Sequence, residues 1–371
     1  MMLRVGNLIV KELIQFGRDR LLTMFILLVP ALQLLLLAQA IERGINEQPV
    51  LILDLDRSYQ SRRLITNLDN TEELRVRYHV DSPAEMRQLL DEGRARMAIV
   101  IPAGFARELA SGQSSQSIQV IADATNTMAA SITMSAASGV VSRFSADLAA
   151  SHGMIVPEFI DFRTNVRFNP TMDVRSYSVP AQLGFITYQV TLAVAALGLA
   201  RERELGTLEQ LMVTPLRHYE LTVGKGIPAI AIGGVNFAVM WFISLVVFQV
   251  PMNGSPLLLA ALTLLFITTE VSWGLVISSI SRTQQQAILF VFIQAMVDMT
   301  FSGFMVPVKN MPALLQFISR FVPLQHYLSI VRGIMLKGAG LDELWPHVVA
   351  LILLSLGMGF VALRSMSRRL E

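Results

Sequence analysis

Six apolar segments, each about long enough to cross a lipid bilayer, dominate the sequence. A bilayer core about 30 Å thick needs about 20 apolar residues in a helix. The segments that approach this length lie at residues 21–41, 179–200, 226–249, 257–280, 287–306 and 346–363. Only 16% of the residues are charged, against about a quarter in a typical soluble domain. We therefore expect a polytopic α-helical membrane protein with six transmembrane helices.

The positions of lysine and arginine predict the orientation of these helices, because cytoplasmic loops carry an excess of both residues. Basic residues precede the first span, follow the last one and also follow the second. This places residues 1–20, an amphipathic segment, and the tail at 364–371 in the cytoplasm. Four basic residues that follow the fifth span oppose the rule: Lys309, Arg320, Arg332 and Lys337.

The first apolar segment has a second interpretation. Its basic start, its apolar stretch and Ala38-Gln39-Ala40 together resemble a cleavable signal peptide. The apolar core is longer than the roughly 7–15 residues usual in signal peptides. We therefore favour an uncleaved membrane anchor.

Residues 42–178 have a different composition and hold most of the charged side chains. Short apolar runs lie at residues 50–56, 74–80, 96–102 and 117–123, and stretches with helical character separate them. This alternation predicts a small α/β domain, which the charge rule places in the periplasm. A long helix is expected over residues 126–151, with apolar residues at every fourth position; this ridge either covers the domain's own sheet or contacts a second copy or an adaptor protein.

Several kinds of chemistry find no support in the sequence. Cysteine is absent, and the five histidines lack the spacing of metal ligands. No G-x-x-x-x-G-K-[ST] motif occurs, so we expect no ATP site on this chain. The net charge of +2 and the scattered basic residues do not suggest a nucleic-acid partner. Asp54, Asp56 and Asp123 fall at strand ends, where turn formation and helix capping are more usual than catalysis. We expect no catalytic, cofactor or metal site.

A charged stretch follows the second apolar segment directly. Residues 201–221 read RERELGTLEQLMVTPLRHYEL, with four acids and three arginines. Thr207 and Gln210 have the spacing of a capping box, which begins a helix, and Pro215 ends it. Leu208, Leu211 and Met212 share one face. We therefore expect a short amphipathic helix on the cytoplasmic surface, and the alternative is an interfacial turn that only anchors the loop.

Two motifs resemble those of one family, the permease subunits of type-2 ATP-binding-cassette (ABC) exporters, particularly the bacterial branch with a large outer domain between the first two spans. The family pattern E-x-G-T-x-E-x-L-x-x-x-P is matched by Glu204, Gly206, Thr207, Glu209, Leu211 and Pro215. A second family stretch, at residues 304–339, is matched by Pro307, Asn310, Met311, Pro312, Pro323, Arg332, Gly333, Lys337 and Gly338. The resemblance covers nearly the whole chain.

The resemblance implies a fold and a set of partners. Residues 204–215 would be the coupling helix, which sits in a groove of a separate ATPase subunit that binds ATP and Mg²⁺. Residues 307–345 would be a re-entrant helical segment in the outer leaflet, which would account for the four awkward positive charges. A second permease copy or a paralogue would complete the transporter in the bacterial inner membrane. The seven charges of residues 201–221 would then act as a stop signal and a docking surface.

The same resemblance leaves the cargo and the wider complex open. The substrate expected of such an exporter is amphipathic or hydrophobic, either drug-like or lipid-like. The sequence leaves open whether a periplasmic adaptor and an outer-membrane channel join the complex.

Polar side chains inside the predicted spans are candidates for a translocation path, because polar groups at membrane depth usually face the bundle interior. Gln294 and Asp298 are four residues apart and should share one helix face. The alternative for each residue is a hydrogen bond between helices. The candidates are Gln182, Gln189, Glu270, Gln294 and Asp298.

Two other function classes are consistent with these features. An ion-coupled secondary transporter would use Glu270 and Asp298 to carry protons, and it would work without an ATPase. A membrane-anchored sensor or receptor would depend on its outer domain alone, so its five later spans would be replaceable.

The predicted topology has a direct test, because the chain contains no cysteine. A cysteine introduced by Ser114→Cys, in the SGQSSQS stretch of the predicted outer domain, should react with a membrane-impermeant thiol reagent in intact cells. Labelling that occurs only after lysis would show that residues 42–178 are cytoplasmic.

Overall fold

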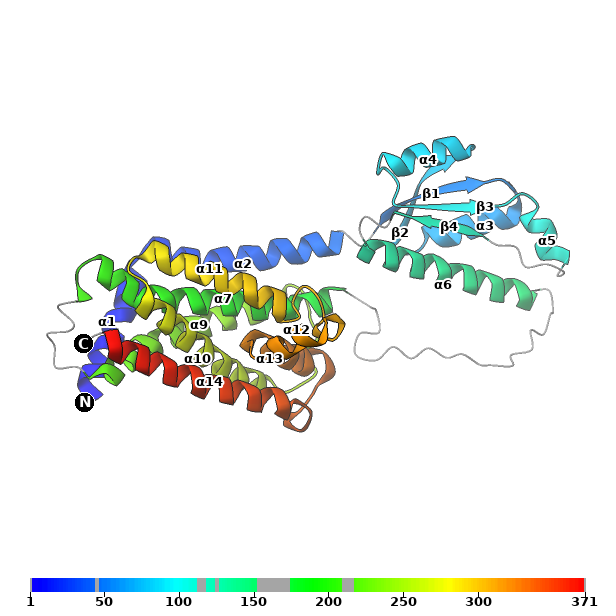
Figure 1. Ribbon diagram of the computed structural model, residues 1–371. Helices are drawn as coiled ribbons and strands as arrows, with labels where there is room; N and C mark the ends of the chain where they lie inside the picture. The colour runs from blue at the N-terminus through cyan, green and yellow to red at the C-terminus, as the bar shows by residue number, and fades with distance from the viewer. Residues whose placement is uncertain are drawn as a thin grey trace. The chain divides into compact units, whose positions relative to one another are not determined.

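The computed structural model describes residues 2–43, 47–111, 118–123, 127–151, 174–208 and 217–369. The chain divides into two compact units. One unit consists of Met1–Ala38 together with Asn165–Glu371, and the other is Gln39–Thr164. Figure 1 shows the helical unit and the α/β unit.

The α/β unit is built on a four-stranded sheet in the order β2-β1-β3-β4. The strands are β1 (Gln48–Asp54), β2 (Leu74–Val80), β3 (Met97–Ile101) and β4 (Gln119–Ala122). Strand β1 pairs in parallel with β2 and β3, whereas β4 pairs antiparallel with β3. The alternation of strands and helices expected from the sequence is present.

Helices cover both faces of this sheet (Figure 1). Helices α3 (Tyr59–Asp69), α5 (Phe105–Ser111) and α6 (Thr127–Ser151) pack on one face, and α4 (Pro83–Asp91) packs on the other. Ala137 and Phe144 of α6 are buried in one cluster with Val50 and Ile99 of the sheet. This packing favours the first interpretation of the long helix, in which its apolar ridge covers the domain's own sheet.

The aspartates at the strand ends act as turn and cap residues. Asp54 Oδ1 accepts hydrogen bonds from the backbone N–H groups of Asp56 and Arg57, both at 3.0 Å. Asp56 accepts from the N–H groups of Gly104 and Ala106 at 2.9 and 3.1 Å, at the start of α5. Slight burial raises the pKa of Asp56, but hydrogen bonds from Ser58 and from these N–H groups outweigh it and hold the pKa below its usual value. Both carboxylates therefore have a local structural role.

The helical unit contains seven long helices among the described residues. They are α1 (Met2–Arg18), α2 (Arg20–Arg43), which crosses the boundary between the units, α7 (Val174–Glu204), α9 (His218–Val246), α10 (Pro256–Ile280), α11 (Gln284–Phe301) and α14 (Leu341–Arg369). Helix α1 begins, and α14 ends, at the same end of this unit (Figure 1).

Four described helices are long and apolar enough to cross a membrane: α7, α9, α10 and α14. A fifth candidate is the pair α1 and α2, which meet at a bend of 66°. The sequence predicts a further span over residues 287–306, but α11 ends at Phe301 and begins with the polar run Gln284–Gln286. The count of six spans therefore stays a prediction.

Helix α7 holds the unit together, because it packs against α9, α10, α11 and α13. Its contact with α10 is so close that a Cβ atom on Gly274 would lie 2.4 Å from Cβ of Ala195. At the same interface the Ser278 hydroxyl accepts hydrogen bonds from the backbone N–H groups of Leu199 and Ala200, at 2.8 and 3.2 Å. Glycine and small polar residues thus set the spacing of these two helices.

Short helices connect α11 to α14, as expected for residues 307–345. They are the 3₁₀-helix η1 (Val308–Asn310), α12 (Ala313–Ser319), α13 (Pro323–Arg332) and the π-helix η2 (Gly333–Lys337). Helix α13 packs between α7, α10 and α14, and the ring of Tyr327 stacks on Phe266 with centroids 3.9 Å apart. Gly338 adopts a φ of 70° that ends η2, and α14 starts at Leu341; the bounds of the re-entrant segment stay a prediction.

Candidate functional site

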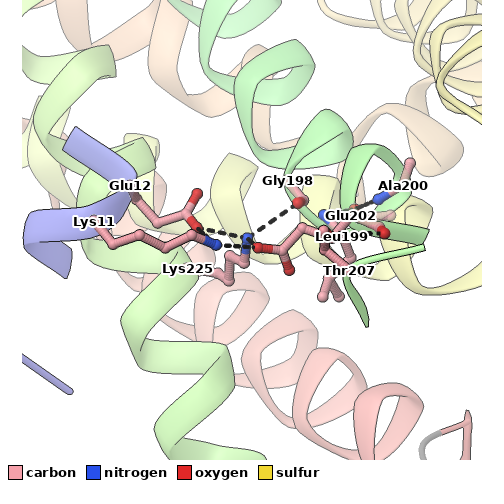
Figure 2. Close-up of polar contacts among 9 residues, drawn as sticks. Lys11, Glu12, Gly198, Leu199, Ala200, Glu202, Thr207 and Lys225 are labelled. Atoms are coloured by element: carbon pink, nitrogen blue, oxygen red, sulfur yellow. Dashed lines mark hydrogen bonds and ion pairs between the residues drawn. The ribbon is translucent and has the colours of Figure 1, made fainter. Parts of the chain in front are cut away.

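A cluster of four charged residues joins α1, α7 and α9 beside the predicted coupling segment (Figure 2). Nζ of Lys225 in α9 lies 2.7 Å from Oε1 of Glu12 in α1 and 2.8 Å from Oε1 of Glu202 in α7. Nζ of Lys11 in α1 also binds Oε1 of Glu202, at 2.5 Å. The network therefore contains two cations and two carboxylates, so its formal charges cancel.

The ion pair between Lys225 and Glu202 is the most deeply buried part of this network. Lys225 is 5% exposed and Glu202 is 3% exposed, and a charge at such a position needs a partner to offset its lost hydration. Besides its ion pair with Glu202, Nζ of Lys225 donates hydrogen bonds to Oε1 of Glu12 at 2.7 Å and to the carbonyl of Gly198 at 3.2 Å. Lys11 and Glu12 lie at the margin, with side chains 46% and 17% exposed.

The end of α7 places Glu202 in this network. Gly206 has a φ of 71°, which suits glycine. The N–H of Thr207 bonds to the carbonyl of Glu202 at 2.9 Å, and the N–H of Gly206 bonds to that of Arg203 at 3.2 Å. This pair of bonds is a Schellman motif, which stops a helix sharply. The chain becomes helical again at Leu208.

The start of α9 is fixed in a similar way. The carboxylate of Glu220, which is 4% exposed, accepts a hydrogen bond from the backbone N–H of Arg217 at 2.9 Å. Lys225 lies about two turns further along α9. Both chain ends that flank residues 209–216 are therefore anchored, and the pair Glu202–Lys225 ties the two helices to each other.

Further charges of the stretch 201–221 bind other helices of the same chain. Arg201 pairs with Asp19 at 3.0 Å, between α1 and α2. Arg203 donates to the carbonyls of Ser279 and Ser281 at the end of α10. Glu204 accepts from the N–H of Gln284 at 2.7 Å, at the start of α11. These contacts give the crowded charges an internal role that is additional to the stop signal and docking surface expected from the sequence.

The predicted coupling residues are described only in part. Glu204, Gly206 and Thr207 lie at the end of α7, and Leu208 is buried. The hydroxyl of Thr207 donates to the carbonyl of Glu202 at 3.2 Å. The remaining residues lie outside the described part of the chain, including the predicted capping partner Gln210: Glu209, Gln210, Leu211, Met212 and Pro215.

The predicted path residues separate into two groups. Gln182 is half-buried and Gln189 is exposed, both on α7. Glu270 of α10 and Asp298 of α11 are buried and close enough for their charges to interact. Nε2 of Gln294 lies 3.0 and 3.1 Å from the two carboxylate oxygens of Asp298, so these two residues do share a face.

The residues of the second motif begin and end the short helices. Pro307 precedes η1, Asn310 ends it, Pro312 precedes α12 and Pro323 is the first residue of α13. At the end of α13, the guanidinium of Arg332 lies 4.2 Å from the ring centroid of Tyr177. A Cβ atom on Gly333 would lie 2.9 Å from Cδ2 of Leu344, so this position has little room for a side chain.

Sequence reasoning missed the ion-pair cluster. The predicted third span starts at residue 226, which leaves Lys225 just outside it and hides the fact that a lysine is buried there. The signals were a lysine beside a long apolar run and the adjacent Lys11 and Glu12 in an amphipathic helix. Neither signal identifies a partner, because the three elements are far apart in the sequence.

Comparison with known proteins identifies the family. The family model described as "ABC-2 family transporter protein" matches residues 20–364. The chain belongs to this family. It is 30% identical over 99% of both chains to the probable multidrug ABC transporter permease YbhR of Escherichia coli K12. It is also 27% identical to the probable multidrug ABC transporter permease YbhS, over 90% of this chain and 89% of YbhS, and 28% identical to the inner membrane transport permease YhhJ, over 94% of this chain and 92% of YhhJ, both from the same strain.

Family membership confirms the resemblance drawn from the two motifs. The ABC-2 chain is a transmembrane transport permease, and an ATP-binding-cassette subunit is its implied partner. Membership argues against an ion-coupled secondary transporter and against a sensor whose outer domain alone is active.

The buried pair predicts the effect of a substitution on the stability of the permease. Lys225→Met leaves the two carboxylates Glu12 and Glu202 with Lys11 as the one remaining cation of the cluster, and we expect a loss of about 3 kcal/mol, the low end for a broken buried ion pair. Lys11→Ala, at a half-exposed position, should cost less than about 1 kcal/mol. The measurement is the thermal denaturation midpoint of the purified protein in detergent.

A double variant supplies the control. Adding Glu202→Gln to Lys225→Met removes the buried carboxylate that has lost one of its two cations, so the double variant should be more stable than the sum of the two single effects predicts. Additive effects would show that the pair is not coupled.

Proposed function

We propose that this chain is the membrane-spanning subunit of an ATP-driven exporter. It would move an amphipathic or hydrophobic substrate, drug-like or lipid-like, out of the cytoplasm or the inner leaflet. ATP and Mg²⁺ would bind to a separate ATPase subunit. The names of YbhR and YbhS, each a probable multidrug ABC transporter permease, support this proposal.

The observation that carries the proposal is the anchoring on both sides of residues 209–216. A segment that receives a push from an ATPase must pass it to the membrane helices without local collapse. Gly206 and Glu220 fix the two flanking helix ends, and the Glu202–Lys225 pair holds those helices together. A contiguous network of this kind supplies a physical route for coupling.

The proposed topology has six spans, with both termini in the cytoplasm and residues 42–178 in the periplasm. The distribution of lysine and arginine supports it. In this arrangement the ion-pair cluster lies at the cytoplasmic ends of α7 and α9, where an ATPase would dock. The segment 307–345 would lie in the outer leaflet of the inner membrane.

The proposed complex contains two permease subunits, either two copies of this chain or this chain and a paralogue. Oligomers commonly close by symmetry, most often as two-fold dimers, and two coupling segments would then serve two ATPase subunits. The α/β domain is the surface for a periplasmic adaptor and an outer-membrane channel in complexes that contain them.

The coupling role of residues 204–215 is tested by a double variant of Glu209→Lys and Leu211→Ala. Reversing the charge and truncating a leucine that fills a partner's pocket should weaken ATPase binding, the truncation alone by about 2 kcal/mol or more, which is about 30-fold. The measurements are pull-down of the ATPase and stimulation of its ATP hydrolysis.

Leu257→Ala is the matched control, because Leu257 is exposed at the first turn of α10, the end opposite Ser278. It should leave ATPase binding unchanged. If the double variant binds the ATPase and transports at the wild-type rate, residues 204–215 are not the coupling segment.

A further inference from the structure

Two carboxylates lie inside the helical unit with no basic partner. Glu270 of α10 is 1% exposed and Asp298 of α11 is 2% exposed. Among the residues that the structure describes, neither forms an ion pair with a lysine, arginine or histidine. Tyr188 of α7, fully buried, lies beside both. We call Glu270, Asp298 and Tyr188 the acidic site.

The hydrogen bonds of the acidic site are incomplete. Gln294 donates its amide to both oxygens of Asp298. By contrast, Oε1 of Glu270 receives no hydrogen bond from the described residues, and the Tyr188 hydroxyl makes none of normal geometry. A buried carboxylate oxygen without a donor is costly, and charged residues at membrane depth usually serve a function. Among the described residues, the acidic site therefore has two carboxylates and no cation paired with them.

Aromatic rings extend from the acidic site. The ring centroid of Phe185 lies 5.9 Å from that of Tyr188, and 4.8 Å from that of Phe304, which follows the end of α11. Aromatic faces attract cations, most strongly where water is excluded. Two carboxylates beside a row of aromatic rings form an environment suited to a cation that is itself apolar.

We propose that Glu270 and Asp298 bind the charged group of a lipophilic organic cation, which makes such cations a substrate class of this transporter. The inference rests on the proposed function and deepens it. Phe185, Tyr188 and Phe304 would contact the apolar part of the cation. Because both carboxylates are buried here, the cation reaches them in another conformation of the transport cycle.

An inorganic cation fits the acidic site less well. Hard cations such as Ca²⁺ or Mg²⁺ require about six oxygen ligands, whereas the Gln294 amide directs its N–H donors at both oxygens of Asp298. No group of three or more His, Asp or Glu side chains that could hold a metal occurs among the described residues. The rings of Phe185 and Phe304, which extend from Tyr188, supply aromatic faces and no oxygen ligands.

The test uses the complete complex of permease and ATPase in proteoliposomes, with two probes of similar shape. Tetraphenylphosphonium is the cation and triphenylphosphine oxide is the neutral probe. Binding is measured by calorimetry, and ATP-dependent transport is measured for both probes. Wild-type complex should bind and transport tetraphenylphosphonium.

Glu270→Gln and Asp298→Asn should each weaken binding of the cation about 30-fold or more, since loss of one partner of a buried charge pair costs about 2 kcal/mol or more. Binding of the neutral probe should change little. Glu270→Asp, which keeps the charge, should retain more cation binding than Glu270→Gln. Val297→Ala, next to Asp298 but apolar, should match the wild type.

Three results would overturn the inference. One is a wild-type complex that does not bind tetraphenylphosphonium, which needs no variant that could misfold. Another is an equal loss for the cation and the neutral probe, which would indicate a structural role. The third is unchanged cation binding in both carboxylate variants, as expected if the pair carries only protons. Failure of the ATPase to bind the permease would instead contradict the proposed function itself.

Discussion

The buried ion pair between Glu202 and Lys225 is the interaction on which the organisation of the helical unit depends. It joins the last turn of α7 to the second turn of α9, and Lys11 and Glu12 extend it to α1. A pair of well-packed apolar residues at this place would be at least as stable by ordinary estimates. Its charges therefore point to a role in fixing which helices move together.

The placement of this pair matters because of what lies between its two helices. Residues 209–216 connect the end of α7 to the start of α9, and all but the last of them fall within the stretch 204–215 that matches the coupling pattern of the family. A displacement of that segment would reach α7 and α9 together, and α1 through Glu12. Helix α7 in turn packs on α10, α11 and α13, so the contacts of one helix connect the cluster to the acidic site at Glu270 and Asp298.

Much of this fold was predictable from local patterns. The four strands were predictable because each is a short run rich in apolar residues between turn residues, and Asp54 and Asp56 do form the turns that such positions usually require. The boundaries of α11 were less predictable. Its polar start at Gln284–Gln286 and its stop at Phe301 depend on contacts with Glu204 and α12, which hydropathy does not register.

In the candidate site, too, some features follow from local sequence patterns and others depend on contacts made only in the folded chain. The coupling pattern and the shared face of Gln294 and Asp298 follow from short-range spacing. The Glu202–Lys225 pair does not, because 22 intervening positions and the separate helix α1 come together only in the folded chain. The positive φ of Gly206 was also hidden: the sequence shows a glycine, but a Schellman end requires the two backbone bonds seen at Glu202 and Arg203.

The claim that the ion-pair cluster passes movement from the coupling segment to the membrane helices is tested most directly by the number of substrate molecules exported per ATP hydrolysed. In a complex carrying Glu12→Cys and Lys225→Cys, the link between α1 and α9 is lost, and a bis-maleimide cross-linker can replace it because the chain has no other cysteine. The account predicts that ATP hydrolysis continues while export per ATP falls, and that cross-linking restores export. An uncross-linked variant that exports at the wild-type ratio would contradict the account.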